Sequence, residues 1–174
     1  MKPKTESVLV VMHVLAWVAA IGLLIKAGAI ITSYIVSTVN PAAAGHLYEM
    51  MDFSALRDYS FWYYTTTVSL IVGLLLLEAA IAFLVIRTLS EIKLANPFTA
   101  SVARKLEGIS YGIIAAWGVA LVYNAQLKWL SKRVDGILDE RVSDEFILLA
   151  GVVFIFAQIF KKGVELQSES ELTV

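Results

Sequence analysis

The sequence predicts an all-α integral membrane protein: a four-helix bundle with both termini in the cytoplasm and an amphipathic extension after the third helix. Apolar residues make up 59% of the 174 positions and charged residues only 17%, whereas a soluble domain is about half apolar and about a quarter charged. The apolar residues also gather into four long segments, and a helix needs roughly 20 such residues to cross a bilayer. We therefore expect one transmembrane domain over residues 1–174, in contact with the lipid bilayer.

Composition also excludes several classes of function. The formal net charge is −1, and direct binding of nucleic acid needs concentrated Lys and Arg. The chain has no Cys, which rules out disulfides, thiolate metal sites and Cys nucleophiles. The sequence also has no zinc-protease, P-loop or nucleophile-elbow motif. We expect no enzymatic activity, no catalytic residue, no cofactor and no metal site.

Four segments are expected to span the membrane: 8–36, 61–86, 109–126 and 146–160. The first carries Lys26 as its only charge, the second carries Glu78, and the third carries none. The fourth has only about 15 residues, a length that also fits a buried helix of a soluble protein. It is assigned as a span because an odd number of spans would place Lys161 and Lys162 on the wrong side of the membrane.

The orientation follows from the Lys and Arg residues near the span ends, which favour the cytoplasmic side. Eight lie on the side that we assign to the cytoplasm: Lys2, Lys4, Arg87, Lys93, Arg104, Lys105, Lys161 and Lys162. Five lie on the other side: Arg57, Lys128, Lys132, Arg133 and Arg141. This excess predicts that the N-terminus and the C-terminus both lie in the cytoplasm.

Two patterns are expected on the outer side. An aromatic cluster opens the second span: Tyr59, Phe61, Trp62, Tyr63 and Tyr64. Such rings favour the headgroup layer, and a ligand-binding cage is the alternative. After the third span, apolar residues recur at a helical period among charged ones: Leu127, Leu130, Val134, Ile137, Leu138 and Val142. This predicts either that the third helix continues beyond the membrane or that an amphipathic helix lies on its surface.

Lys26 and Glu78 are the charged residues inside the predicted spans. A charge at the centre of a span costs about 2.5–3.5 kcal/mol on insertion scales, so it usually faces the bundle interior. At about 1.5 Å per residue, Lys26 lies roughly 27 Å and Glu78 roughly 13 Å from the inner boundary, which argues against a simple ion pair. Lys26 either reaches the outer interface or lines a cavity. Glu78 is either a structural hydrogen-bonding hub or a contact for an ion or ligand.

Other polar residues lie near predicted span ends: His13, Asn124 and Gln158. Water or headgroups can satisfy them there, so none indicates a site. The third span also carries a ridge of small residues spaced by four: Gly108, Gly112, Ala116 and Ala120. Such ridges let helix backbones approach closely in lipid. The ridge packs either against another span of this chain or against a second copy in a homo-oligomer.

The loop between the second and third spans contains a turn motif: Asn96, Pro97, Phe98 and Thr99. Pro97 cannot continue the preceding helix, and it moves Asn96 out of the α region. Thr99 or Ser101 can then cap a new helix. The first turns of that helix carry the basic pair Arg104 and Lys105.

The segment after the fourth span begins with Lys161 and Lys162, which can anchor the span at the headgroup layer. Gly163 can end the helix or permit a bend. An acidic strip follows beside apolar residues: Glu165, Leu166, Glu169, Glu171, Leu172 and Val174. The strip can bind a basic protein surface, or it can act as a solvated tail that keeps the C-terminus away from anionic lipid. The last three residues also formally fit a PDZ-type C-terminal ligand.

Together, the turn motif and the C-terminal segment resemble the bacterial family catalogued as domain of unknown function 2975. The resemblance is carried by Asn96-Pro97-Phe98-Thr99 with Arg104-Lys105-Leu106, and by residues 155–167 followed by 169–174. The chain departs from many members at Ala103, where others are more basic. The resemblance implies a multi-pass protein of the bacterial inner (plasma) membrane with no established catalytic activity.

Members of that family are often accompanied by a small cytoplasmic helix-turn-helix regulator, so the resemblance implies a regulatory or sensory protein that binds or sequesters one. The residues expected to bind it are Asn96, Pro97, Phe98, Thr99, Arg104, Lys105, Lys161, Lys162, Gly163, Glu165, Leu166, Glu169 and Glu171. Two other functions stay open. One is a small transporter or channel component that uses Glu78, with Lys26 lining the same cavity. The other is a structural or assembly subunit that packs through the small-residue ridge.

Overall fold

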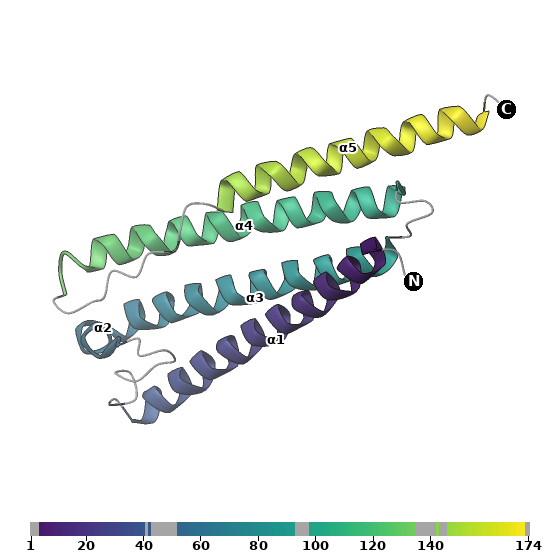
Figure 1. The fold of residues 1–174 in the computed structure, drawn as a ribbon. Helices are drawn as coiled ribbons and strands as arrows, with labels where there is room; N and C mark the ends of the chain where they lie inside the picture. Colours follow the sequence, from purple (N-terminus) through teal and green to yellow (C-terminus); the bar gives the residue numbers. More distant parts are fainter. Residues whose placement is uncertain are drawn as a thin grey trace. The chain divides into compact units, whose positions relative to one another are not determined.

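The computed structural model describes residues 4–40, 42, 52–92, 98–134, 142 and 146–172. Within them the chain forms helices and no strand, which confirms the all-α prediction. The helices are α1 (Lys4–Val39), α2 (Ser54–Tyr59), α3 (Phe61–Glu91), α4 (Ala100–Leu130) and α5 (Phe146–Leu172) (Figure 1). The four long helices contain the four segments that the sequence assigns to spans.

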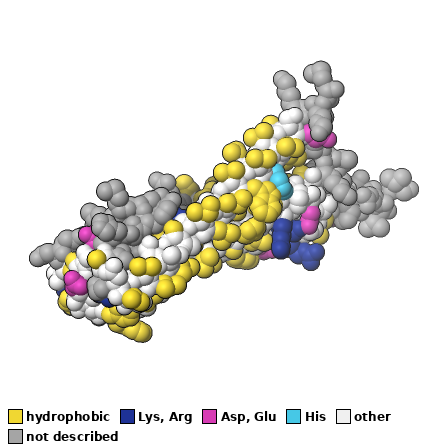
Figure 2. Space-filling view, turned by 90° about the horizontal axis from the view of Figure 1, so that it is seen from below, with side chains coloured by type: hydrophobic (Ala, Val, Ile, Leu, Met, Phe, Trp, Pro, Cys, Tyr) yellow, Lys and Arg dark blue, Asp and Glu magenta, His cyan; other side chains and the backbone are white. Residues whose placement is uncertain are grey.

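Three of the helices are long and apolar enough to cross a membrane: Glu6–Val39, Phe61–Glu91 and Ala100–Leu130. Hydrophobic side chains cover much of the face drawn in Figure 2, and charged side chains there are few. The chain is therefore a membrane protein. In α5 the apolar stretch is shorter and Lys161 and Lys162 follow it, so the fourth crossing stays a prediction.

The chain forms two compact units. The first unit comprises Met1–Ile21, Glu78–Ala115 and Glu145–Val174, and the second comprises Gly22–Leu77 and Ala116–Asp144. The helices α1, α3 and α4 each contribute to both units, whereas α5 belongs to the first alone.

The short helix α2 packs into the core of the second unit. Leu56 is fully buried there in a cluster with Ile30 from α1, Tyr64 and Val68 from α3, and Leu130 from α4. Asp52 fixes the start of α2, because its carboxylate accepts hydrogen bonds from the Ser54 amide at 2.8 Å and from the Ser54 hydroxyl at 2.6 Å. Ser60 is extended and ends α2 directly before α3 begins.

Polar side chains join helices of the second unit. The Gln126 amide on α4 donates to the Thr66 and Thr67 hydroxyls on α3, at 2.9 and 2.8 Å. The hydroxyls of Ser37 on α1 and Tyr64 on α3 share a buried hydrogen bond of 2.8 Å. Hydrogen bonds of this kind hold helices together in a bilayer, where water cannot satisfy the groups.

The chain turns back after α4, which corrects the prediction that this helix continues beyond the membrane. α4 ends at Leu130, whose carbonyl accepts from the amides of Arg133 and Val134. The Asn124 side chain then holds the backbone of Val142 through two hydrogen bonds, of 2.9 and 3.0 Å. A continuous helix would place these residues about 27 Å apart. The surface helix expected as the alternative falls mostly outside the described residues.

From the sequence, we expect water or headgroups to satisfy the polar residues near span ends. The Asn124 amide is instead satisfied by backbone groups of the protein. His13 is likewise engaged by protein, since its Nε2 accepts a hydrogen bond of 3.1 Å from the Trp17 indole. Trp17 in turn contacts the Phe83 ring of α3 in the first unit.

In the first unit, α4 lies beside α5 and contacts α3. The buried Ser110 hydroxyl on α4 donates to the Ala150 carbonyl on α5 at 3.0 Å. On the small-residue ridge, a Cβ added at Gly112 would lie 2.9 Å from Cγ1 of Ile81 on α3, so a glycine permits this close approach. Gly108 has open space around it. The other two ridge residues, Ala116 and Ala120, belong to the second unit and are buried there. Packing of the ridge against a second copy stays a prediction.

Candidate functional site

The site lies in the first unit, where the start of α4 meets the C-terminal half of α5. Thr99 caps α4: its hydroxyl accepts a hydrogen bond of 3.3 Å from the Val102 amide, and its carbonyl accepts from the Ala103 amide at 3.0 Å. Thr99 is therefore the N-terminal cap of α4, and Ser101 is not. Threonine is one of the residue types that commonly cap helices in this way. Asn96 and Pro97, which precede it in the turn motif, lie outside the described residues.

Glu91 ties the end of α3 to the first turns of α4. Its carboxylate forms an ion pair with Lys105 and accepts a hydrogen bond of 2.8 Å from the Ser101 hydroxyl. The Lys105 side chain is only 22% exposed. Lys105, which the sequence suggests as a partner-binding residue, is thus engaged within the protein.

Phe98 joins the turn motif to α5. Its ring lies 5.2 Å from the Phe160 ring, centroid to centroid. A Cβ added at Gly163 would lie only 2.6 Å from Cδ1 of Phe98, closer than real Cβ contacts allow. Because glycine leaves that space open, the Phe98 ring rests directly on the α5 backbone.

The course of α5 corrects the expectation that Gly163 ends the last helix; that Gly163 permits a bend stays a prediction. α5 continues unbroken through Gly163 to Leu172. The glycine therefore serves packing rather than helix termination. The two segments that carry the family resemblance, far apart in the sequence, form one surface.

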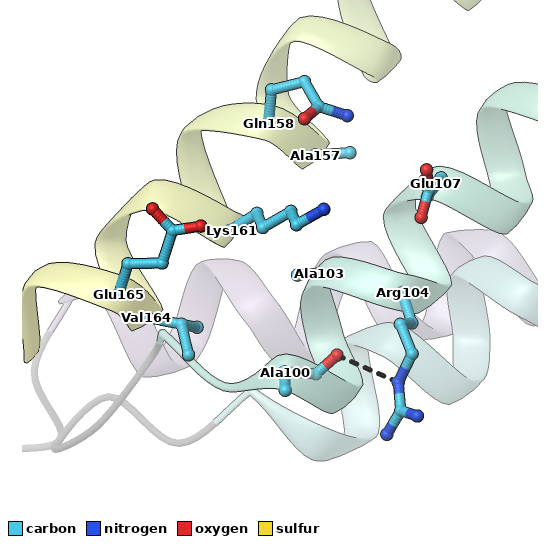
Figure 3. Close-up of a pocket in the computed structure, with 9 residues that line it drawn as sticks. All are labelled: Ala100, Ala103, Arg104, Glu107, Ala157, Gln158, Lys161, Val164 and Glu165. Carbon is cyan, nitrogen blue, oxygen red and sulfur yellow. Dashed lines mark hydrogen bonds between the residues drawn. The ribbon is translucent and has the colours of Figure 1, made fainter. Parts of the chain in front are cut away.

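A cavity of about 470 Å³ lies between α4 and α5 in the same region, and we refer to it as the α4–α5 cavity. Its lining residues are Ala100, Ala103, Arg104, Glu107, Ala157, Gln158, Lys161, Val164 and Glu165 (Figure 3). Small and aliphatic side chains leave the space open, and five polar or charged side chains surround it. In Figure 3, Gln158 and Lys161 point from α5 towards α4.

The charged groups around the cavity differ in their partners. Glu165 accepts an ion-pair hydrogen bond of 2.9 Å from Lys162, one turn earlier on α5. This bond holds the pKa of the Glu165 carboxyl below its ordinary value and raises the pKa of Lys162. By contrast, neither Lys161 nor Arg104 forms an ion pair with any described residue; the Arg104 Nε donates to the Ala100 carbonyl at 3.3 Å.

From the cavity towards its C-terminus, α5 presents an acidic face that comprises Glu165 and Glu169, with the apolar Leu166 beside them. All three side chains are exposed, and Glu165 and Glu169 are four residues apart, which places them on one side of the helix. The side chain of Glu171 and the last two residues lie outside the described part of the chain. The acidic strip predicted from the sequence is thus a helical surface over these three residues.

Lys26 lies in the second unit and Glu78 in the first. Both side chains are partly buried, and each has an interaction partner. The interpretations of these residues stay predictions, including the absence of a simple ion pair between them.

The aromatic residues that open α3 form a second candidate region, in the second unit. The Tyr63 ring lies 5.2 Å from the Trp129 ring of α4, and the Arg133 guanidinium lies 3.5 Å from the centre of that Trp ring. A shallow groove of about 340 Å³ is lined by Trp62, Tyr63, Thr66, Gln126 and Trp129. With Arg133 already on the Trp129 ring, this arrangement resembles an interfacial aromatic belt more than an open cage.

The structure brings to the α4–α5 region two residues that the sequence does not assign to a site, Glu91 and Glu107. It also brings Gln158 there, which the sequence places among the polar residues near span ends that indicate no site. Gln158 precedes Lys161 by three residues, so helical periodicity alone places both on one face. Glu91 and Glu107 carry no such signal, because their positions depend on how α3, α4 and α5 pack.

The family model described as Protein of unknown function (DUF2975) matches residues 40–174. The match includes both the turn motif and α5. No curated protein and no solved structure is significantly similar to the chain.

Proposed function

Since the chain belongs to the DUF2975 family and is a membrane protein, we propose that it is a non-enzymatic regulatory protein of the bacterial plasma membrane. It has both termini in the cytoplasm and binds a small cytoplasmic helix-turn-helix regulator. The contact surface is the α4–α5 surface, which comprises Phe98, Arg104, Lys161, Glu165, Leu166 and Glu169. The regulator is held at the membrane in one state of the bundle and released in another.

One observation carries this proposal: Phe98 rests on Gly163, so the turn motif and α5 make one continuous surface. Both segments lie within the family match. A surface assembled from two distant segments, with an exposed helix projecting beyond it, suits recognition of a folded partner.

The charge of the acidic face supports a partner of this class. Glu165 and Glu169 are exposed and share one side of α5. A helix-turn-helix protein presents Lys and Arg to the DNA phosphates. Carboxylates on α5 can attract the same basic surface, so binding to the membrane protein and binding to DNA exclude each other.

The test uses the tagged full chain, purified from membranes of its own cells in detergent. Helix-turn-helix proteins that copurify are identified, produced in pure form, and measured for binding to the chain with and without their DNA duplex. We expect Glu165→Lys with Glu169→Lys to weaken binding at least tenfold, because two attractive contacts become repulsive.

Glu6→Lys is the matched control, because Glu6 is also exposed and lies near the same membrane side, at the start of α1. It should leave regulator binding unchanged. Binding that is insensitive to the α5 reversal, or that does not compete with DNA, would contradict the proposal. Transport through Glu78 and a purely structural role both predict that no such regulator binds.

A further inference from the structure

The α4–α5 cavity is bordered by polar side chains that have few partners within the protein. Gln158 has no hydrogen-bond partner and Lys161 no ion-pair partner among the described residues. From the described part of the chain, Glu107 accepts only a long hydrogen bond of 3.5 Å, donated by the Tyr111 hydroxyl. Two neighbouring cations on the same helices are already paired, Lys105 with Glu91 and Lys162 with Glu165. The cavity therefore offers donors and an acceptor together, in a space of about 470 Å³ that accommodates a small ligand.

The balance of charge indicates the class of ligand. Arg104 and Lys161 supply two positive charges, and Glu107 supplies one negative charge; Glu165 is balanced by Lys162. A guanidinium and an ammonium are suited to a phosphate group. The Glu107 carboxylate can only accept when ionised, so it suits a ligand that also carries an N–H or O–H donor.

The cavity lies where the helices change from apolar to polar surface. Ile159, two residues before Lys161, is 53% exposed, and Tyr111, one turn after Glu107, is 58% exposed. Charged residues lie on the other side of the cavity, at Arg104 and Glu165. Exposed apolar residues beside charged ones mark the headgroup layer of a bilayer, so the walls of the cavity face the polar part of neighbouring lipids.

We propose that the α4–α5 cavity binds the headgroup of one phospholipid, a phosphodiester that bears a hydrogen-bond donor such as ethanolamine. The phosphate contacts Arg104 and Lys161, and the ammonium contacts Glu107. Ala103 and Ala157 leave the space between the helices that the headgroup occupies. The lipid site shares Arg104 and Lys161 with the proposed regulator surface. Lipid retention is measured with no regulator present, so the two proposals can fail separately.

The test compares two lipids that share the phosphodiester and differ in the donor. The full chain is purified in detergent with equal amounts of phosphatidylethanolamine and phosphatidylcholine, and retained lipid is counted by native mass spectrometry. We expect about one retained ethanolamine lipid per chain and at least a tenfold preference over the choline lipid, because three methyl groups remove the donors that Glu107 accepts.

Two variants and a control separate the contacts. Lys161→Gln should lower retention of the ethanolamine lipid about tenfold, since it removes a charge-assisted contact to phosphate. Glu107→Gln should reduce the preference between the two lipids. Arg87→Gln, which removes an exposed charge near the end of α3 and outside the cavity lining, should leave both quantities unchanged. Circular dichroism and the elution volume confirm that each variant folds.

Equal retention of the two lipids, or equal losses in Lys161→Gln and Arg87→Gln, would overturn the proposal. Free phosphoethanolamine distinguishes a lipid from a soluble ligand. If it displaces the retained lipid at the concentration at which the lipid itself binds, the occupant is a soluble phosphate compound and the lipid site is refuted. If displacement needs a concentration at least a hundredfold higher, the acyl chains contribute and the lipid assignment holds.

Discussion

At the scale of single residues, the α4–α5 surface depends on one missing side chain. The Phe98 ring occupies the space in which a Gly163 side chain would stand, and Phe160 completes its packing. Glycine inside a helix usually lowers helix stability by about 1 kcal/mol relative to alanine. Here the packing of the Phe98 ring against Gly163 offsets that cost. The same contact holds the turn motif against α5.

We expect Gly163→Ala to destabilise the protein despite its better helix propensity. Forcing a methyl group against the ring costs about 1–3 kcal/mol, and the propensity gain returns about 1 kcal/mol. The net loss should appear as a lower thermal midpoint in detergent, followed by circular dichroism. In a Phe98→Ala background the same substitution should instead be stabilising, because the obstructing ring is gone.

Gly151→Ala is the matched control, since Gly151 lies on the same helix with open space around it. It should be neutral or stabilising. If Gly163→Ala and Gly151→Ala gave equal changes in both backgrounds, Phe98 would not rest on Gly163 in the folded protein.

At the scale of helices, apolar runs predict where the long elements lie because a spanning helix needs a nearly continuous apolar stretch. They do not predict where a helix ends. Gly163 has the residue type of a helix terminator, yet α5 continues through it, and the contact with Phe98 accounts for a glycine at this position. The hydrogen bonds between the Asn124 side chain and the Val142 backbone could not be predicted from the sequence either. Hydrogen bonds between distant segments depend on how the helices pack, which periodicity does not reveal.

Some features of the candidate site could likewise be predicted from the sequence, and others could not. The turn motif and the basic and acidic residues of α5 could be found from their composition. The cavity could not, because it arises where small residues of two helices, Ala103 and Ala157, face each other. The roles of individual cations also needed the structure: Lys105 and Lys161 are alike in sequence, yet one is paired with Glu91 and the other borders a cavity.

Hydrogen bonds between helices lead to a prediction at this scale. Gln126→Leu removes the donor that serves both Thr66 and Thr67. We expect it to lower the free energy of unfolding by about 1 kcal/mol, because two hydrogen bonds are lost and each such contact between membrane helices contributes roughly 0.6 kcal/mol on average. Unfolding in mixed detergent and sodium dodecyl sulfate measures the change.

The control for this change is Ala125→Leu, which adds the same side chain at a neighbouring exposed position of α4. Its free energy of unfolding should stay close to that of the unmodified chain. Thr66→Val and Thr67→Val should each have a smaller effect than Gln126→Leu, because each leaves one hydrogen bond in place. Full stability of Gln126→Leu would show that these bonds do not hold α3 and α4 together.

At the scale of the whole molecule, topology in the membrane links the fold to the proposed function. A regulator in the cytoplasm can reach the α4–α5 surface only if the end of α3, the start of α4 and the end of α5 all face the cytoplasm. That requires α5 to cross the bilayer, although its apolar stretch is the shortest of the four. Lys161 and Lys162 after this stretch favour such a crossing, since Lys and Arg gather on the cytoplasmic side.

The natural absence of Cys allows this topology to be tested with single cysteines. We expect cysteines at Ser90 and Leu166 to react with a membrane-impermeant maleimide only after the cells are opened, and a cysteine at Ser131 to react in intact cells. All three positions are exposed and lie beyond the apolar stretches. If Ser131 and Leu166 reacted from the same side, α5 would not cross the membrane. If all three gave the reverse pattern, the α4–α5 surface would face outwards and could not hold a cytoplasmic regulator.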